Sequence, residues 1–359
     1  MSHDTTIDPN QTVLVTGATG YVAGWLVKNL LDAGLTVHAA VRDPDNSDKV
    51  AHLLALADSA PGTLKLFKAD LLDAGSYSEA MAGCTVVFHT ASPFILTFDD
   101  AQKDLIEPAR QGTLNVLDSV NKTDSVKRVV LTSSCAAIYG DNIDLQTSGK
   151  KALDETDWNT TSSLTHQPYS YSKTLAEKAA WETVEQQSRW DLVTINPSLV
   201  LGPGINPRST SASLGMFKQF ASGKLKAGVP AFYIAAVDVR EVADAHVTAA
   251  FKPEARGRYI LSGHDTSFIE FADILRNQFG NDYGFPQRIL PKPLVWLVGP
   301  LADKSMTRAM VSRNVGHPIR FDHTKSEQEL GIHYRPLKDS IADFFNQLQD
   351  SGQIPKAKH

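Results

Sequence analysis

Residues 13–24 read VLVTGATGYVAG, in which an apolar strand runs into closely spaced glycines and then into a helical pattern. Glycines at such a turn let a pyrophosphate approach the helix N-terminus, because no Cβ blocks the backbone and the free N–H groups attract the anion. The spacing is GxxGxxA, and an ordinary strand-to-helix turn is the alternative interpretation. Because the turn opens a series of strands and helices, it predicts a dinucleotide site lined by Gly17, Thr19, Gly20, Tyr21 and Val22.

Strand and helix patterns continue to alternate after this turn. Further apolar strand patterns lie at residues 35–41, 64–69, 85–91, 126–132 and 192–196, with helical patterns between them. This alternation predicts an α/β fold, a Rossmann-type doubly wound parallel sheet with helices on both faces. The later elements are mixed, and residues 284–316 are punctuated by Pro and Gly. We expect a flexible N-terminus (1–11), a dinucleotide-binding domain (12–203) and a smaller mixed C-terminal substrate lobe (204–359), some segments of which return to the first domain.

Composition argues against several classes of protein. The 359 residues carry 35 basic and 40 acidic side chains, a formal charge of −5, which argues against nucleic-acid binding. Cys84 and Cys135 form no CxxC pair or zinc-type cluster, so we expect no metal. No apolar run approaches the roughly 20 residues of a membrane helix, and the polar start is unlike a signal peptide. We expect a soluble, cytoplasmic protein, whose oligomeric state the sequence leaves open.

The end of the second strand selects the nucleotide. An acidic residue about 20 positions after the glycine turn would bind the ribose 2′-hydroxyl of NAD. Arg42 stands there instead, and Lys49 follows seven residues later. A guanidinium holds a 2′-phosphate through paired hydrogen bonds. A solvated loop arginine beside Asp43 is the alternative, but the pattern favours NADP(H).

A tyrosine and a lysine four residues apart, Tyr169 and Lys173, share one face of a predicted helix. A free phenol has a pKa of about 10 and is a poor proton donor near neutral pH. An ammonium about 4 Å away would lower this pKa, so the pair fits proton donation to a developing alkoxide. The alternative is a surface helix in which Lys173 pairs with Glu177.

Two serines, Ser133 and Ser134, end the strand pattern at 126–132. Parallel sheets of this class bind their ligands at the carboxyl ends of the strands. A hydroxyl at that edge can hydrogen-bond a substrate carbonyl, although serines also cap strand ends without any such role.

Other stretches are AVRDPDNSDKVAHL (40–53), FKADLLDAGSYSEAMAGCTVVFHTASP (67–93), VVLTSSCAA (129–137) and YSYSKTLAEKAAW (169–181). With them the chain resembles the extended short-chain dehydrogenase/reductases, and most closely the branch of dihydroflavonol reductases, cinnamoyl-CoA reductases and microbial carbonyl or aldehyde reductases. The resemblance extends over nearly the whole chain, from about residue 11.

The resemblance implies a role for each matching residue. Tyr169 would donate the proton, Lys173 would lower its pKa and hold the nicotinamide ribose, and Ser134 or else Ser133 would orient the carbonyl. Arg42 and Lys49 would hold the 2′-phosphate. The remaining implied contacts are Asp70 and Leu71 at the adenine, Thr90, Ala91 and Ser92 along the cofactor, Pro197, Ser198 and Val200 over the nicotinamide, and Phe94 and Tyr139 at the substrate.

The sequence also departs from the family pattern. Ala109 stands where many short-chain enzymes have an asparagine of the proton relay, and His166-Gln167-Pro168 replaces the aromatic-cysteine stretch of cinnamoyl-CoA reductases. Tyr139 replaces the flavonoid-contacting asparagine of dihydroflavonol reductases. We therefore expect NADP(H)-dependent reduction of a small aldehyde or ketone, aromatic or aliphatic. An NDP-sugar epimerase or dehydratase with tightly bound NAD is the alternative. The intact Tyr169–Lys173 pair argues against a non-catalytic cofactor sensor.

Overall fold

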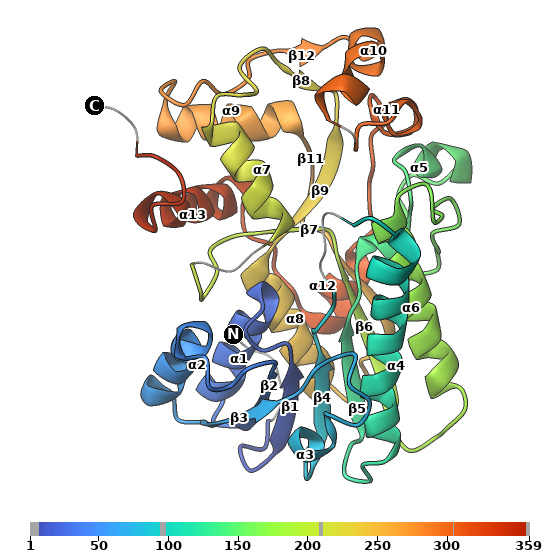
Figure 1. Ribbon diagram of the computed structural model, residues 1–359, viewed down its shortest axis with the longest axis vertical. Coiled ribbons are helices and arrows are strands. Elements are labelled where there is room, and N and C mark those ends of the chain that lie inside the picture. The colour runs from blue at the N-terminus through green and yellow to red at the C-terminus, as the bar shows by residue number, and fades with distance from the viewer. Residues whose placement is uncertain (1–6, 94–97, 208–210, 304, 357–359) are drawn as a thin grey trace.

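Seven parallel strands form the large sheet in the lower half of Figure 1. The computed structural model describes residues 7–93, 98–207, 211–303 and 305–356. In spatial order the strands are β10 (Gly257–Leu261), β6 (Asp191–Pro197), β5 (Arg128–Thr132), β4 (Val86–His89), β1 (Thr12–Thr16), β2 (Thr36–Val41) and β3 (Thr63–Lys68). The predicted doubly wound α/β fold is confirmed.

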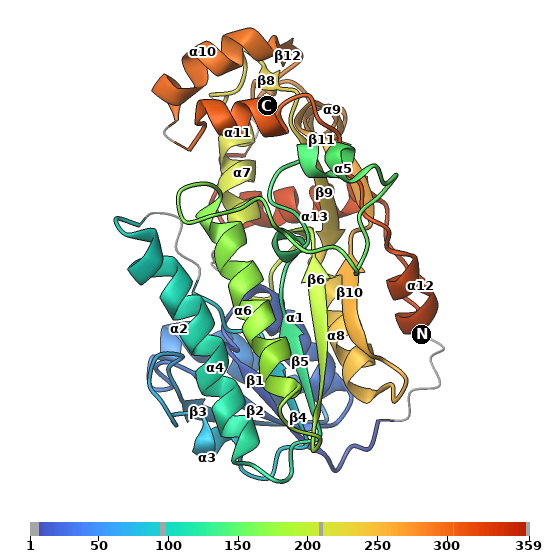
Figure 2. The same cartoon turned by 90° about the vertical axis from the view of Figure 1, so that its right-hand side faces the viewer.

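Helices cover both faces of this sheet. One face carries α1 (Tyr21–Asp32), α2 (Ser47–Ser59) and α8 (Val239–Phe251), and the other carries α3 (Ser78–Met81), α4 (Glu107–Asn121) and α6 (Pro168–Val184). Figure 2 shows α4 and α6 side by side in front of the strands. Side chains alternate between the two layers, so Val13 and Val15 enter the α1 core while Leu14 enters the α4 core. This two-sided burial explains the nearly unbroken apolar strand sequences.

The strand order reverses between β1 and β4. From β1 the sheet grows through β2 to β3 on one side, and through β4, β5 and β6 to β10 on the other. Sheets of this kind bind ligands at the carboxyl ends of the strands where the order reverses. The glycine turn after β1 and the residues after β4 lie at this point.

A smaller mixed lobe lies above the sheet in Figure 1. It holds a three-stranded sheet, β11 (His264–Ser267), β9 (Tyr233–Asp238) and β7 (Leu199–Leu201), and a pair of short strands, β12 (Ile289–Leu290) and β8 (Val229–Pro230). Its aromatic core includes Phe217, Phe271 and Phe345. The larger helices around it are α7 (Ala212–Ala221), α9 (Phe268–Phe279) and α13 (Leu337–Asp350).

Two of the later elements belong with the large sheet, because α8 packs against α1 and β10 pairs with β6. Residues 284–316, although punctuated by Pro and Gly, contain two helices, α10 (Lys292–Ala302) and α11 (Arg308–Asn314). The short elements are a π-helical turn η1 (Gln102–Ile106), a 3₁₀ turn η2 (Cys135–Ala137), α5 (Ile143–Ser148) and α12 (Thr324–Leu330).

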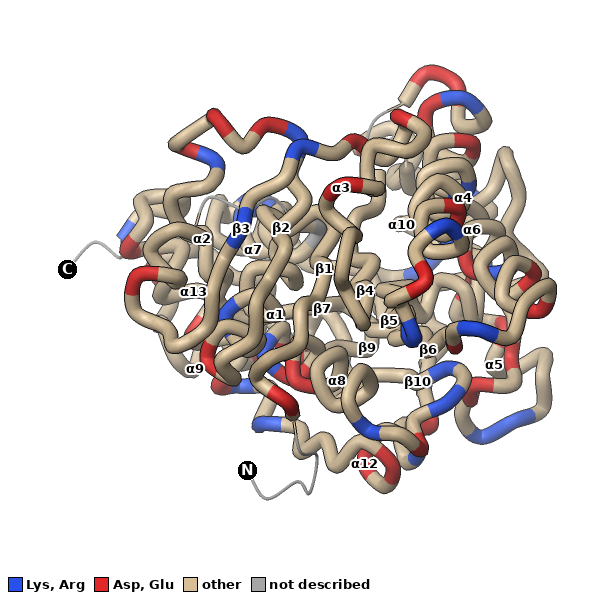
Figure 3. Tube along the Cα trace, turned by 90° about the horizontal axis from the view of Figure 1, so that it is seen from below, with Lys and Arg blue, Asp and Glu red and all other residues tan. Residues whose placement is uncertain are grey.

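Charged residues of both signs surround the sheet. In Figure 3 blue and red segments are spread around the rim, while β1 and β4 in the middle carry neither. Among the described residues, no helix is long and apolar enough to cross a membrane.

Candidate active site

The glycine turn brings the loops after β1 and β4 into contact. Gly17 has φ +62°, and a Cβ at this position would lie 2.9 Å from the Cα of Ala91. The backbone N–H of Ala91 donates to Oγ1 of Thr16 at 3.1 Å. Only glycine fits here, both for its positive φ and for the close approach. Helix α1 then begins after Gly20, which has no side chain to cap the first backbone N–H groups of the helix, and uncapped N–H groups of this kind can bind an anion. This cradle fits a pyrophosphate.

The other residues predicted in this turn divide by role. The Tyr21 hydroxyl donates to the carbonyl of Gly202, and its ring stacks on Phe344 at 6.1 Å. Tyr21 therefore joins α1 to the upper lobe through its side chain. Val22 packs against the core under α1, and Thr19 is half-buried.

The predicted 2′-phosphate ligands lie in solvent beside β2. Arg42 directly follows β2, Lys49 lies in the first turn of α2, and both are exposed. Asn46 caps α2 by accepting the N–H of Lys49 at 3.2 Å, which orients this turn. Within the described ranges neither cation forms an ion pair with a carboxylate, so both charges are available to an anion.

The residues predicted at the adenine form a tight turn after β3. The Asp70 carboxylate accepts the N–H of Leu72 at 2.9 Å, and Asp70 is exposed. Leu71 packs on Gly112 of α4, and its carbonyl accepts a hydrogen bond from Asn115 at 2.8 Å.

The predicted catalytic residues meet at the carboxyl ends of β4 and β5. Nζ of Lys173 donates to Oγ of Ser92 at 2.9 Å, in the segment that follows Thr90 and Ala91. The side chains of Tyr169 and Ser134 share a hydrogen bond. Ser134 also accepts the N–H of Ala136 at 3.1 Å. Helix α6 and the end of β5 thus bring Ser134, Tyr169 and Lys173 together.

The two serines have different surroundings. Ser133 is buried, and its hydroxyl donates to the carboxylate of Glu177. Ser134 is half-buried and contacts the Tyr169 phenol. Of the two hydroxyls, that of Ser134 is the one beside the predicted proton donor.

Burial dominates the proton equilibria of the pair. It raises the pKa of Tyr169 to about 12, and the hydrogen bond from Ser134 only partly opposes this rise. Burial also lowers the pKa of Lys173 to about 8, while the charge of Glu177 acts in the opposite direction. That Lys173 lowers the pKa of Tyr169 during the reaction stays a prediction, because desolvation is the largest influence on both groups in the chain alone. The Lys173 ammonium is hydrogen-bonded to Ser92.

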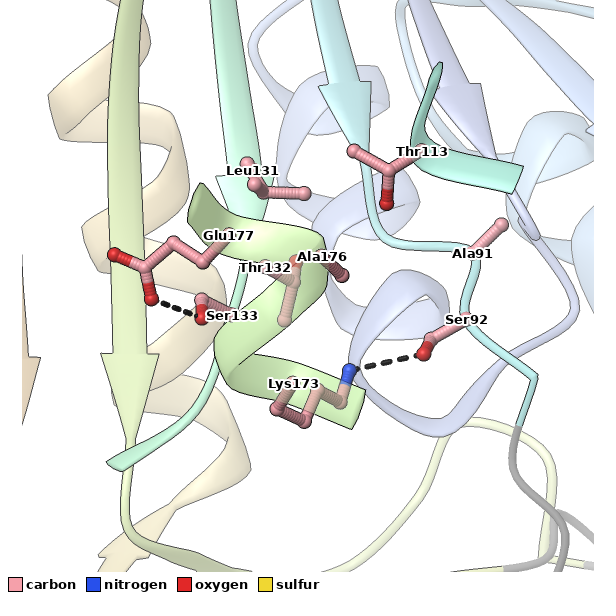
Figure 4. Close-up of a pocket in the computed structure, with 9 residues that line it drawn as sticks. All are labelled: Ala91, Ser92, Thr113, Leu131, Thr132, Ser133, Lys173, Ala176 and Glu177. Carbon is pink, nitrogen blue, oxygen red and sulfur yellow. Dashed lines mark hydrogen bonds between the residues drawn. The ribbon is translucent and has the colours of Figure 1, made fainter. Parts of the chain in front are cut away.

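Glu177 is a buried member of this site that the sequence did not reveal. The alternative of a surface Lys173–Glu177 pair is wrong, since Glu177 is 1% exposed and pairs with Arg258 of β10 at 2.6 Å. Figure 4 shows the two α6 side chains diverging around a small pocket, Lys173 toward Ser92 and Glu177 toward Ser133. Only the spacing of four after Lys173 hinted at Glu177, and no local pattern pointed to Arg258.

The remaining predicted residues follow β6 or lie at the base of the lobe. Pro197 ends β6 and is buried, and Val200 of β7 packs against the α1 core. The N–H of Ser198 donates to the carbonyl of Leu261 at 2.9 Å. The Ser198 hydroxyl, just after the carboxyl end of β6, is a buried polar group without a hydrogen-bond partner among the described residues.

Of the two predicted substrate contacts, Tyr139 is among the described residues. Tyr139 packs edge-on against Phe321 at 5.3 Å, and burial raises the pKa of its phenol. Its ring is therefore part of the wall between η2 and the lobe. Phe94 lies outside the described residues.

The sheet order, the glycine turn and the spacing of Tyr169 and Lys173 on α6 are those of an extended short-chain dehydrogenase/reductase. Residues 13–261 match the profile of the NAD dependent epimerase/dehydratase family, and the chain belongs to this family.

Several relatives are similar over most of their length. Cinnamoyl-CoA reductase CAD2 of Medicago truncatula is 38% identical over 341 residues, which cover 94% of this chain and 95% of the relative. Anthocyanidin reductase of Arabidopsis thaliana is 39% identical over 277 residues, covering 74% and 79%. The crystal structure of yeast methylglyoxal/isovaleraldehyde reductase Gre2 complexed with NADPH has a TM-score of 0.75 and 27% identity, covering 96% of this chain and 100% of that one. The predicted family is confirmed, and the chain is an oxidoreductase.

Proposed function

We propose that the protein reduces a small aldehyde or ketone to the alcohol with NADPH. The observation that carries this proposal is the contact of Tyr169 with Ser134, next to Lys173 and two strands away from β1 and its glycine turn. A phenol beside a second hydroxyl, at the edge of the sheet where the strand order reverses, can donate two hydrogen bonds to one carbonyl oxygen. The reductase relatives support the same reaction.

The cofactor supplies a hydride to the carbonyl carbon when it is bound. Tyr169 donates its phenolic proton to the carbonyl oxygen as negative charge develops there. Ser134 donates a hydrogen bond to the same oxygen and holds it against Tyr169. The Lys173 ammonium stabilises the phenolate that remains, since desolvation makes that charge costly.

NADP(H) is the cofactor that suits the exposed cations beside β2. Arg42 and Lys49 are two exposed cations, without an ion-pair partner among the described residues, that can bind a 2′-phosphate. The cradle at Gly17 and the start of α1 suits the pyrophosphate. The yeast relative is itself a complex with NADPH.

The substrate is a small aromatic or aliphatic carbonyl compound. Aromatic side chains form the walls of two separate apolar clusters, one where Tyr139 meets Phe321 and another where Phe232 meets Phe268. An apolar wall of this kind suits an uncharged ring or chain better than a sugar nucleotide. The reductase relatives also favour this function over an NDP-sugar epimerase. We further propose that residues 12–203 form the cofactor domain and residues 204–359 mainly the substrate lobe.

Loss of NADPH absorbance with a panel of aldehydes and ketones tests the reaction. Tyr169→Phe should bind NADPH normally and lose at least about a hundredfold in kcat, because general acid catalysis contributes about 10²–10⁴. Tyr171→Phe is the matched control, since Tyr171 lies on the same helix and should retain activity. Near-normal turnover by Tyr169→Phe would rule out this mechanism.

A further inference from the structure

We infer that Glu177 is a positioning residue of the reductase site, whose buried carboxylate holds the Ser133–Ser134 strand end against Tyr169 and sustains the positive charge of Lys173. This inference rests on the proposed function for Tyr169, Ser134 and Lys173. Tyr169, Lys173 and Glu177 follow one another at intervals of four on α6 and so share one helix face.

The carboxylate is tied to both serines of the strand end. One oxygen of Glu177 accepts from the Ser133 hydroxyl and from Nδ2 of Asn196 at 2.8 Å. Nδ2 of Asn196 also donates to the backbone carbonyl of Ser134 at 3.2 Å. The orientation of Ser134 toward Tyr169 therefore depends on a hydrogen-bonded chain that starts at Glu177. Neutral amides or hydroxyls in place of this carboxylate would weaken every link, because hydrogen bonds to an ionised acceptor are the stronger ones.

Arg258 locks the carboxylate in this direction. Nε of Arg258 donates to Glu177 at 2.6 Å, and Nη1 donates to the carbonyl of Glu155 at 3.0 Å. The guanidinium also stacks over the ring of Trp158 at 3.9 Å. With its other oxygen held by Ser133, Glu177 does not form a direct ion pair with Lys173 and acts on it through the low dielectric of the pocket between them.

Among the residues that the structure describes, few charged groups surround Lys173. Besides Tyr169 and Glu177 on α6, the groups around it are Ser92 after β4, His89 at the end of β4, Thr132 and Ser133 at the end of β5, and Thr113 of α4. Burial lowers the pKa of His89 to about 3, so this imidazole is neutral at physiological pH. Burial also lowers the pKa of Lys173, and the Glu177 carboxylate opposes that fall. The positive charge of Arg258 opposes part of the effect of the Glu177 carboxylate on Lys173. This guanidinium, however, also donates hydrogen bonds to several backbone carbonyls.

The test compares Glu177→Gln with the double variant Glu177→Gln/Arg258→Met, which removes both charges and so avoids an unpaired buried guanidinium. Competitive labelling of Lys173 by acetic anhydride in the cofactor-free protein, read by mass spectrometry, follows the free amine as a function of pH. We expect its midpoint to move about one pH unit lower in Glu177→Gln, because an opposite charge at short range shifts a pKa by about one to three units. The basic limb of the pH profile of kcat should move in the same direction. In Glu177→Gln the value of kcat should fall, whereas KM for NADPH should change less.

Glu182→Gln is the control, because Glu182 is exposed on the same helix. A folded Glu177→Gln protein with the parental labelling midpoint and the parental kcat profile would overturn the inference. If Glu177→Gln does not fold, the double variant decides the matter on both readouts. A parent protein that reduces no carbonyl, but in which Lys173 labelling still depends on Glu177, would refute the proposed function and leave the effect of Glu177 on Lys173 supported.

Discussion

The two ends of the proposed cofactor crevice handle charge in opposite ways. At the β2 end, Arg42 and Lys49 are exposed and carry no carboxylate partner among the described residues. At the β5 end, Glu177 and Arg258 are buried, and each makes several hydrogen bonds. Exposed charges are screened by water and salt, whereas buried charges interact strongly and are costly when unpaired. The first end should therefore govern which nucleotide binds, and the second should govern proton transfer and stability.

The largest effect is expected when the buried pair is broken. Arg258→Met leaves the Glu177 carboxylate desolvated without its counter-charge, so the free energy of unfolding should fall by about 3–5 kcal/mol. Urea unfolding followed by circular dichroism measures this change. The double variant Glu177→Gln/Arg258→Met should regain much of the loss, because no unpaired charge remains. If the free energy of unfolding of Arg258→Met lies within about 1 kcal/mol of the parent value, the Glu177–Arg258 pair is not a strong buried ion pair.

A smaller effect is expected at the turn that lies between the two ends. Gly17→Ala places a Cβ 2.9 Å from the Cα of Ala91 at φ +62°, and the protein should lose about 1–3 kcal/mol of stability together with NADPH binding. Gly75 is the control, because it has φ +81° but a Cβ there would meet no atom of the described residues within 4 Å. Gly75→Ala should lose only the conformational part, about 1 kcal/mol, and keep NADPH binding. Equal losses in both variants, measured by urea unfolding and NADPH titration, would exclude a role for the contact with Ala91.

What the sequence predicted depends on how local the signal was. The glycine turn, Arg42 after β2 and the spacing from Tyr169 to Lys173 each lie within one element or one connection, and all were found from pattern alone. The partnership of Glu177 with Arg258 joins α6 to β10 across 81 residues, and no periodicity reports it.

The degree of burial of a side chain was the second property that the sequence did not reveal. The pKa of Tyr169 depends on desolvation by the folded surroundings, which a spacing of four cannot reveal. The bounds of helix α10 were hard to predict for another reason, since Gly299 and Pro300 lie within it and Leu301 is 86% exposed. Its sequence lacks both the buried stripe and the uninterrupted run that usually indicate a helix.

The smallest effect on stability, and the sharpest on selectivity, is expected at the exposed end. Arg42→Ala should change the free energy of unfolding by less than about 0.5 kcal/mol, because it removes no buried contact. It should weaken NADPH binding about tenfold while leaving NADH binding nearly unchanged, since only NADPH carries the 2′-phosphate. Fluorescence titration at low and high salt measures both affinities, and the salt dependence of NADPH binding should decrease in the variant. Lys122→Ala, at the far end of α4 and paired with Asp118, is the control. If Arg42→Ala binds NADPH with the parental affinity at low salt, selection of the nucleotide does not reside at this end, and the contrast between the two ends fails.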